Sequence, residues 1–350
     1  MTTLDPVGAT CPLPRTETER VLLGHGSGGQ LMAELLDDVI TPGLGEHEPL
    51  EDAAVVTADG VDIVFSTDGF VVTPRFFPGG DIGSLAVFGT VNDLAMRGAR
   101  PVALSLAYLL EEGFPVDELR RITVSAGQAA EACGVRVVTG DTKVVGRGAA
   151  DGVYLTTTGI GLRRPGAAPT ATGGVPGDVV VLSGPIGAHG MAIMSAREGL
   201  GFETAIRSDS RPLHELVAAM IDAGGAGVHT LRDPTRGGLA SALNELAAAS
   251  GVGVEVEESA IGVPEAVASA CELLGLDPLH VANEGCLVAF LAPQVADAVL
   301  AAMRANPAGR EARVIGTVTA GPVGRVAART LVGSRRVVDM LVGEQLPRIC

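Results

Sequence analysis

The last residue of the sequence, Cys350, places a thiol at the end of the chain, where a polypeptide is most mobile. In the segment before it, Pro347 fixes its own φ and favours an extended conformation at Leu346. From Gly343 to Cys350 such a segment can span roughly 25 Å at about 3.3 Å per residue, which is enough to reach from solvent into a cleft. Two interpretations follow, a frayed terminus with an incidental cysteine or an arm that carries the thiol to a site.

Lys143 is the only lysine among the 25 Lys and Arg residues of the chain. So strong a preference for Arg indicates that Arg serves wherever a positive charge is sufficient. Lys143 is then a candidate for chemistry that needs an amine able to lose its proton, because a guanidinium cannot do this. The alternative is an accidental survivor. Lys143 directly follows Gly140-Asp141-Thr142, at the end of a predicted strand at 135–138.

Carboxylates mark the ends of predicted elements in the first half of the chain. They are Asp52, Asp68, Asp93 with its neighbour Asn92, and Asp141. Hard cations take oxygen ligands and bridge them to phosphate, and they offset the repulsion between an acidic protein and a nucleotide. Each of these residues alone is more typical of a turn. Together, beside Gly, Thr, Asn or Ala, they favour a site for Mg²⁺ and a triphosphate.

The overall charge excludes some classes of partner. The formal net charge of −16 argues against nucleic acid and against an anionic membrane, since both require a basic surface. The longest apolar runs are too short to span a bilayer, and the first residues do not form a signal peptide. Five cysteines without a C-x-x-C pair argue against disulfides and a zinc site, so we expect a cytoplasmic protein.

The elements that must position these residues form two mixed halves, so the fold class is α+β with two domains. In the first half we expect strands at 61–65, 101–110, 135–138 and 153–161, and helices at 82–97 and 116–133. A Gly/Pro-rich stretch at 166–177 predicts the domain boundary. The resulting divisions are an irregular extension at 1–23, domains at 24–165 and 166–341, and a flexible tail at 342–350.

A glycine-rich loop at Gly24–Gly29 precedes a helical pattern at 30–40. Such a loop can present backbone amides to an anion. The signal is weak because the loop is neither a Walker sequence nor G-x-G-x-x-G after a strand, and a flexible turn is the alternative. His25 in this loop has two equal interpretations, a contact with the tail or phosphate and a cap of the turn.

Eight segments together resemble one known family. In chain order they are 24–29, 66–68, 76–80, 89–93, 138–145, 232–238, 283–285 and 347–350. In these segments the sequence is similar to the HypE family of hydrogenase maturation proteins. That family belongs to the ATP-using superfamily of aminoimidazole ribonucleotide synthetase, selenophosphate synthetase and thiamine-monophosphate kinase. The resemblance covers residues 22–350, and the final Pro-Arg-Ile-Cys distinguishes HypE within the superfamily.

The resemblance implies an activity, cofactors and partners. A HypF-like carbamoyltransferase would place a carbamoyl group on the sulfur of Cys350, and the chain would use ATP and Mg²⁺ to dehydrate the thiocarbamate to a thiocyanate. The cyano group would then pass to iron on a HypC–HypD complex as a ligand of [NiFe] hydrogenase. The implied fold is the two-domain fold of aminoimidazole ribonucleotide synthetase. In that superfamily the N-terminal sheets of two protomers join, so a homodimer is expected.

The resemblance also implies roles for individual residues. It gives Asp52, Asp68, Asp93 and Asp141 as Mg²⁺ and nucleotide ligands, with further nucleotide contacts at Gly26, Gly28, Asn92, Thr142, Asp233 and Arg236. Lys143 and Glu284 would form the proton relay that strips the amide nitrogen. Arg348 would orient the tail and offset its terminal carboxylate, which otherwise raises the pKa of the Cys350 thiol.

Other interpretations stay open at this point. A selenophosphate synthetase would need a Cys beside an N-terminal Gly/Lys loop, whereas Cys11 is flanked by prolines and has no lysine near it. A small-molecule kinase of the same superfamily and a non-enzymatic thiol carrier are the further alternatives. The remaining cysteines are expected to be buried core residues, and four histidines have no metal-ligand spacing: His189, His214, His229 and His280.

Overall fold

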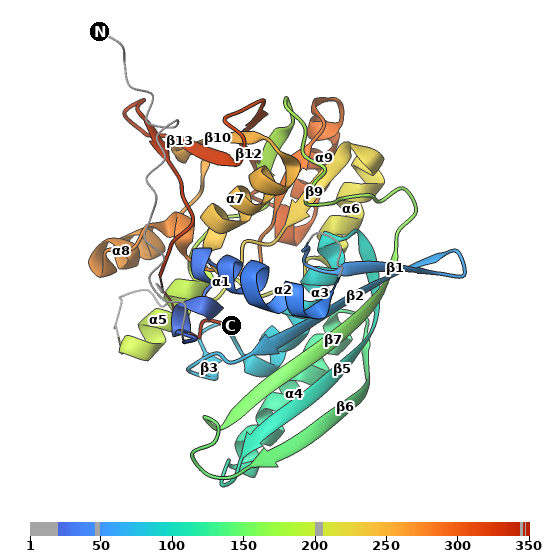
Figure 1. The fold of residues 1–350 in the computed structure, drawn as a ribbon, viewed down its shortest axis with the longest axis vertical. Helices are drawn as coiled ribbons and strands as arrows, with labels where there is room; N and C mark the ends of the chain where they lie inside the picture. Colours follow the sequence, from blue (N-terminus) through green and yellow to red (C-terminus); the bar gives the residue numbers. More distant parts are fainter. Residues whose placement is uncertain (1–19, 46–49, 200–205, 344–345, 347) are drawn as a thin grey trace.

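The computed structural model of the chain describes residues 20–45, 50–199, 206–343, 346 and 348–350. Cys11, Pro347 and most of the predicted N-terminal extension lie outside the described residues. The described chain forms two lobes with a cleft between them, and the last residue lies at their junction (Figure 1).

The first lobe is built on a five-stranded sheet of order β1-β2-β7-β5-β6. Its strands are β1 (Ala54–Ala58), β2 (Val61–Phe70), β5 (Ala99–Glu111), β6 (Arg136–Val145) and β7 (Val153–Arg163). β5 and β6 pair in parallel, and the other neighbours are antiparallel. Side chains alternate between the faces of a sheet, so Val64, Leu104 and Leu155 are buried while Phe65 and Ile160 remain exposed on the opposite face.

Two helices cover the buried face of this sheet, α3 (Ile82–Met96) and α4 (Val116–Ala132) (Figure 1). The side chain of Asp81 caps α3 by accepting from the backbone N–H groups of Gly83 and Ser84. α3 is buried on nearly every side because it packs against the sheet, α4 and the second lobe. The helices predicted at 82–97 and 116–133 are confirmed.

The second lobe contains a seven-stranded sheet of order β14-β13-β10-β12-β8-β11-β9. The strands are β8 (Val179–Leu182), β9 (Val228–Arg232), β10 (Gly253–Glu257), β11 (Val288–Leu291), β12 (Arg313–Thr319), β13 (Arg325–Arg329) and β14 (Arg335–Val337). Helix α7 (Gly238–Ser250) packs on one face, and α6 (His214–Gly224) and α9 (Pro293–Ala305) pack on the other. This arrangement is a helix–sheet–helix sandwich.

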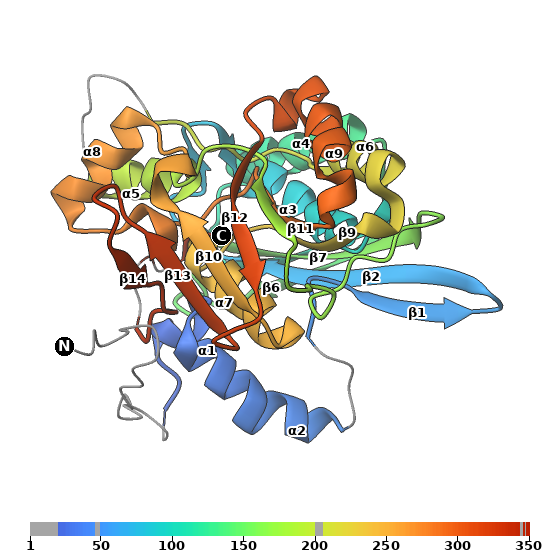
Figure 2. The same ribbon diagram turned by 90° about the horizontal axis from the view of Figure 1, so that it is seen from above.

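The remaining elements connect the lobes. Helices α5 (Ala188–Glu198) and α8 (Glu265–Leu274) extend the apolar core of the first lobe, and Leu346 and Ile349 join the same core. Near the beginning of the chain, α1 (Gln30–Leu35), a π-helical turn (Leu36–Ile40) and α2 (Thr41–Leu44) run along the outside of the molecule (Figure 2). A short hairpin of β3 (Phe76–Phe77) and β4 (Gly80–Asp81) leads into α3.

Two predicted strands are longer in the structure than in the prediction. β2 continues to Phe70, so Asp68 lies within a strand, and β6 continues to Val145, so Asp141–Lys143 belong to a strand and not to a loop. β6 pairs with β5 along its length. Gly140 permits this pairing, because a Cβ there would lie 2.1 Å from the carbonyl oxygen of Leu106. None of the helices in the described ranges has the length and apolar character needed to cross a bilayer.

Candidate active site in the interdomain cleft

A cleft of about 540 Å³ lies between the lobes, and both contribute to its walls. The polar wall holds most of the residues selected from the sequence, namely Gly28, Asp52, Asp68, Asp93, Asp233, Arg236, Glu284 and Cys350. An apolar wall is formed by Met32, Ala33 and Leu36 near the beginning of the chain and by Ala242 and Ala249 of α7.

Three carboxylates form the centre of the polar wall. Ligand oxygens of Asp52, Asp93 and Asp233 all lie within 4.8 Å of one another. Asp52 lies in the loop before β1, Asp93 in the last turn of α3, and Asp233 directly after β9. The hydroxyl of Ser66 ties two of them together, since it bonds to the Asp93 carboxylate at 2.7 Å and to the Asp52 carbonyl at 3.2 Å.

The electrostatics of this cluster favour a bound cation. Burial raises the pKa of Asp52 to about 8, with Arg232 at 3.0 Å lowering it in part, and burial raises the pKa of Asp233 to about 6. Burial and the neighbouring carboxylates also raise the pKa of Asp93. Three close oxygen donors with too little positive charge around them are a suitable donor set for Mg²⁺. The residues present therefore fit the ion that the sequence predicted.

Glu284 and Asp68 add two further carboxyls to the cleft. The pKa of Glu284 is raised well above its ordinary value by burial and then by the charges of Asp233 and Asp68. Burial likewise raises the pKa of Asp68, against the effect of Arg236. A buried carboxyl group whose pKa is raised is a candidate for proton transfer during a reaction. Glu284 lines the same cleft as the thiol of Cys350.

The segment that carries Glu284 is fixed by backbone contacts from a neighbouring loop. The N–H of Glu284 donates to the Asp209 carboxylate at 3.2 Å, and its carbonyl accepts from the N–H of Arg211. Asn92 holds that loop in turn, because its amide donates to the Arg211 carbonyl and accepts from the N–H of Leu213. Asn92 is buried with both ends of its amide engaged. Asn92, predicted as a nucleotide contact, does not line the cleft, and its amide instead supports the loop beside Glu284.

The glycine-rich loop packs against the loop that carries Arg236. Gly28 has φ +77°, and a Cβ there would lie 2.7 Å from Cβ of Arg236, so this close approach requires glycine. The guanidinium of Arg236 donates to the carbonyl of Gly26 at 3.2 Å. His25 caps its turn by accepting from the N–H of Leu22, which is one of the two interpretations given to it above.

The tail docks with its thiol inside the cleft, a position that the sequence left open. Ile349 is buried, the terminal carboxylate of Cys350 accepts from the N–H of Val71 at 3.0 Å, and Cys350 lines the cleft. Burial raises the pKa of the Cys350 thiol, and Arg236 lowers it in part. Arg348 was expected to offset the terminal carboxylate, but its guanidinium is engaged by Asp151 at 2.6 Å.

Asp141, Thr142 and Lys143 lie outside this cleft. They are exposed on β6, and Nζ of Lys143 pairs with Asp141 at 2.6 Å. This contact lowers the pKa of Asp141 through a hydrogen bond, in contrast to the raised values in the cleft. The register places β7 and β5 between Asp68 and β6, a separation of roughly 14 Å at about 4.8 Å per strand. Within one chain, Asp141 therefore does not lie beside Asp52 and Asp93, and Asp233 is the third member of the carboxylate cluster.

Sequence reasoning missed the residues that hold the tail. His189, set aside for lack of metal-ligand spacing, is fully buried and bonds to the carbonyl of Ile349 at 2.8 Å. Arg197 donates to the carbonyl of Arg348 at 3.0 Å. Neither residue belongs to a motif, and backbone-directed contacts leave no pattern in the sequence by which they could have been found.

Comparison with known families defines the class of protein first. The N-terminal domain model of AIR synthase related proteins matches residues 50–163, and the C-terminal domain model of the same proteins matches residues 175–329. The thiamine monophosphate kinase of Aquifex aeolicus shares the fold, with a TM-score of 0.64 at 17% identity over 89% of this chain and 99% of that one. The chain is thus a two-domain protein of the AIR synthase related class.

Closer relatives identify the family within that class. The carbamoyl dehydratase HypE of Cupriavidus necator is 53% identical over 95% of each chain, and that of Escherichia coli is 43% identical over 94% of this chain and 99% of that one. A solved structure of HypE in complex with ATP has a TM-score of 0.80 at 45% identity, over 95% of this chain and all of that one. A HypE–HypF complex gives 0.83 at 44% identity, over 89% of this chain and all of that one. The chain belongs to the HypE family.

Proposed function

We propose that the chain is an ATP-dependent carbamoyl dehydratase that acts on its own C-terminal cysteine. It converts a carbamoyl group on the sulfur of Cys350 into a thiocyanate, which supplies the cyanide ligands of [NiFe] hydrogenase. The observation that carries the proposal is that Cys350, Glu284 and the acidic cluster line one cleft. Relatives named carbamoyl dehydratase and a relative solved with ATP support it.

The chemistry requires a better leaving group than the carbamoyl oxygen. Transfer of the γ-phosphoryl group of ATP to that oxygen supplies one, and loss of phosphate together with both nitrogen protons leaves S–C≡N. Asp52, Asp93 and Asp233 would hold Mg²⁺, which neutralises phosphate charge when bound. Arg236, on the same wall, contacts the phosphates or the carbamoyl oxygen and offsets the negative charge that develops there.

Proton removal from the amide nitrogen falls to Glu284 and Lys143. Glu284 lies in the cleft with the docked thiol, and its raised pKa shows that its buried environment favours proton binding. Lys143 is exposed on β6 of the same chain, so in this proposal a second copy of the chain delivers it, together with Asp141 and Thr142.

A homodimer is therefore part of the proposal. The open face of the first sheet supports it, because Phe65, Ile160 and Leu162 are each more than one third exposed on that face, and β6 is an open edge. Joining two such faces about a twofold axis covers both copies alike. Sedimentation velocity checks this part, and a monomer at micromolar concentration contradicts it.

The proposed partners follow from the same family. A HypF-like carbamoyltransferase loads Cys350, as supported by the solved complex of a relative with HypF, and a HypC–HypD complex accepts the cyano group. We place the activity in the cytoplasm, because the described cysteines carry free thiols, which suits a reducing compartment.

The test follows the mass of the intact protein. Cys350 is carbamoylated, MgATP is added, and the wild-type chain is expected to lose one water while ATP is consumed. E284Q is expected to bind MgATP but to retain the carbamoyl mass. A wild-type chain that binds MgATP and keeps its carbamoyl group overturns the dehydratase proposal and favours a thiol carrier.

A further inference from the structure

The last three residues of the chain lie beside the segment that follows β2. The N–H of Val71 donates to the terminal carboxylate of Cys350 at 3.0 Å, and the N–H of Thr73 donates to the carbonyl of Arg348 at 3.2 Å. The carbonyl between them, that of Ile349, faces the opposite way, toward α5. The two tail carbonyls and the terminal carboxylate therefore each have a hydrogen-bond partner, and these partners define which tail residue reaches the cleft.

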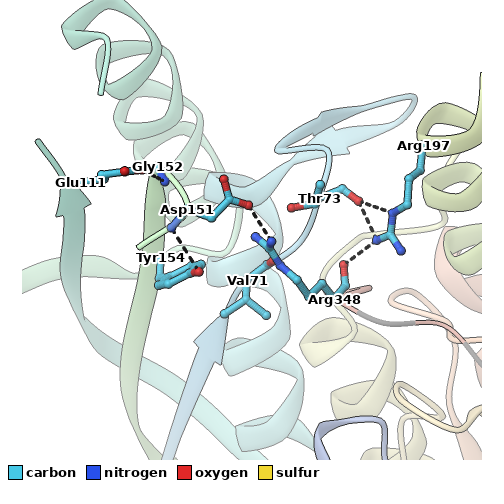
Figure 3. Close-up of polar contacts among 8 residues, drawn as sticks. All are labelled: Val71, Thr73, Glu111, Asp151, Gly152, Tyr154, Arg197 and Arg348. Carbon is cyan, nitrogen blue, oxygen red and sulfur yellow. Dashed lines mark hydrogen bonds and ion pairs between the residues drawn. The ribbon is translucent and has the colours of Figure 1, made fainter. Parts of the chain in front are cut away.

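Arg348 is held in an unusual conformation at the centre of this contact. Its φ of +49° lies in the left-handed region, which a non-glycine residue occupies only when its surroundings enforce it. Its side chain donates to the carbonyl of Val71 at 2.9 Å and to Asp151 at 2.6 Å (Figure 3). Asp151 lies on a loop that Glu111 braces by accepting from the N–H groups of Gly148 and Gly152.

Two residues of α5 hold the tail from the other side. Arg197 donates to the carbonyl of Thr73 at 2.7 and 3.0 Å and to that of Arg348 at 3.0 Å, so it joins the first lobe, the second lobe and the tail (Figure 3). His189 is buried beside Phe77, and its Nε2 lies 2.8 Å from the Ile349 carbonyl. Since a carbonyl only accepts, Nε2 carries the proton and Nδ1 accepts from the hydroxyl of Ser208.

We propose that His189 and Arg197 are positioning residues that fix the register of the tail and thereby place the Cys350 sulfur in the cleft. The inference deepens the proposed dehydratase function and, for its catalytic consequence, rests on it. Neither residue lines the cleft, so they act through the tail and not through the nucleotide. His189 and Arg197 bind the backbone carbonyls of Ile349 and Arg348. They therefore fix which tail residues lie against α5, and so how far the Cys350 thiol extends into the cleft.

The direct test measures how fast a small alkylating reagent labels Cys350 in the full chain. H189F keeps an aromatic ring against Phe77 but removes the donor, and R197M removes the guanidinium. Each is expected to raise the labelling rate of Cys350 at least about tenfold, as the loss of a buried hydrogen bond predicts. H189Q and R197K retain a donor and are expected to return toward the wild-type rate.

Internal controls separate positioning from unfolding. Cys133, Cys271 and Cys286 are buried in the cores, and their labelling is expected to stay slow in every variant. R304M is the matched control, because Arg304 also donates to a backbone carbonyl, that of Ala312, far from the tail. If H189F also exposes the three core cysteines, the labelling rate of R197M decides whether the tail is positioned by these contacts. The side chain of Arg197 is only partly buried, so its replacement is expected to disturb the core less. Wild-type labelling of Cys350 in R197M and in a folded H189F overturns the proposal.

A second measurement connects the contact to catalysis. In the carbamoylated protein, H189F and R197M are expected to slow the loss of water at least about tenfold while MgATP affinity stays unchanged, and H189Q is expected to restore the rate. Wild-type dehydration rates in both variants overturn the positioning role. If the wild-type chain itself does not dehydrate, the proposed function fails, and the labelling result still decides whether these residues hold the tail.

Discussion

The interdomain cleft and the open edge strand β6 both contain acidic residues that the sequence predicted as ligands. Those in the cleft are largely buried, whereas the one on β6 is exposed to solvent. In the cleft, burial raises the pKa values of Asp52, Asp93 and Asp233. On β6, Asp141 is exposed, and its pKa is lowered by a hydrogen bond from Lys143. The cleft therefore has an unmet need for positive charge, whereas the pair on β6 is already neutral.

This difference shows which half of the site one chain can build alone. The cleft combines residues from β2, α3, the end of β9 and the tail. Folding of a single chain is therefore enough to bring these residues together. Asp141, Thr142 and Lys143 of β6 face solvent within one chain. In our proposal they act only in a dimer, where they reach the cleft of the second copy. The predictions below test this division, beginning with the largest effect.

Removing one carboxylate of the cleft is expected to have the largest effect. D93N removes the central ligand and is expected to weaken MgATP binding by at least about 100-fold, measured by titration calorimetry. Its thermal stability is expected to stay the same or rise in EDTA, because burial and the neighbouring carboxylates raise the pKa of Asp93 and D93N removes that unfavourable carboxylate. D141N, on the edge strand, is expected to weaken binding less. Equal losses in the two variants would contradict the division between cleft and edge.

Mixed dimers test whether Lys143 acts across two copies. D93N inactivates the cleft of its own chain, and K143M inactivates the cleft that it faces. Two chains that each carry one change leave one intact cleft per mixed dimer. Random mixing of equal amounts is therefore expected to restore about a quarter of the wild-type dehydration rate. If mixing restores nothing while mixed dimers are present by native mass spectrometry, Lys143 serves its own chain or none.

Sequence reasoning succeeded where the chemistry needs particular side chains. Asp52, Asp93 and Glu284 were selected as polar residues at element ends or in family motifs, and the structure brings them into one cleft with Cys350. The helix predicted at 82–97 is present as α3, which carries Asp93 and is buried on nearly every side.

The strand order decided what the sequence could not predict. Asp68 and Gly140 lie in one row of the sheet, but β7 and β5 separate them, and no local pattern encodes that order. The contacts of His189 and Arg197 were equally hidden, since a backbone carbonyl is the same group at every position. The structural contacts of Asn92 could not be predicted either, because an amide suits a ligand and a structural clamp equally well.

The pH dependence of stability is expected to distinguish the cleft from an ordinary acidic surface. With pKa values near 8 for Asp52 and near 6 for Asp233, the folded state holds more protons than the unfolded state between about pH 4 and pH 8. In EDTA, stability is therefore expected to fall as pH rises through this window. Mg²⁺ offsets the charge, so its effect on Tm is expected to be larger at about pH 8 than at about pH 5.

D52N is the control for this experiment. D52N removes the carboxyl group with the higher of the two pKa values. It is expected to flatten the decline of Tm with rising pH in EDTA. A wild-type Tm in EDTA that rises across the window, or a Mg²⁺ effect independent of pH, would show that the cluster does not carry uncompensated charge. Both outcomes are read from thermal unfolding in matched buffers.

The smallest effect is expected on the edge strand itself. K143M breaks an exposed ion pair, and exposed pairs contribute little to folding, so its Tm is expected to stay within about 2 °C of wild type. R232M breaks the contacts of Arg232 with Asp52 and Glu245, and leaving the buried carboxylate of Asp52 unpaired costs about 3–5 kcal/mol. Its Tm is therefore expected to fall by many degrees, partly recovered by Mg²⁺. A large loss of stability in K143M would mean that the Lys143–Asp141 pair stabilises the contact between two copies, and the dependence of that loss on protein concentration would show it.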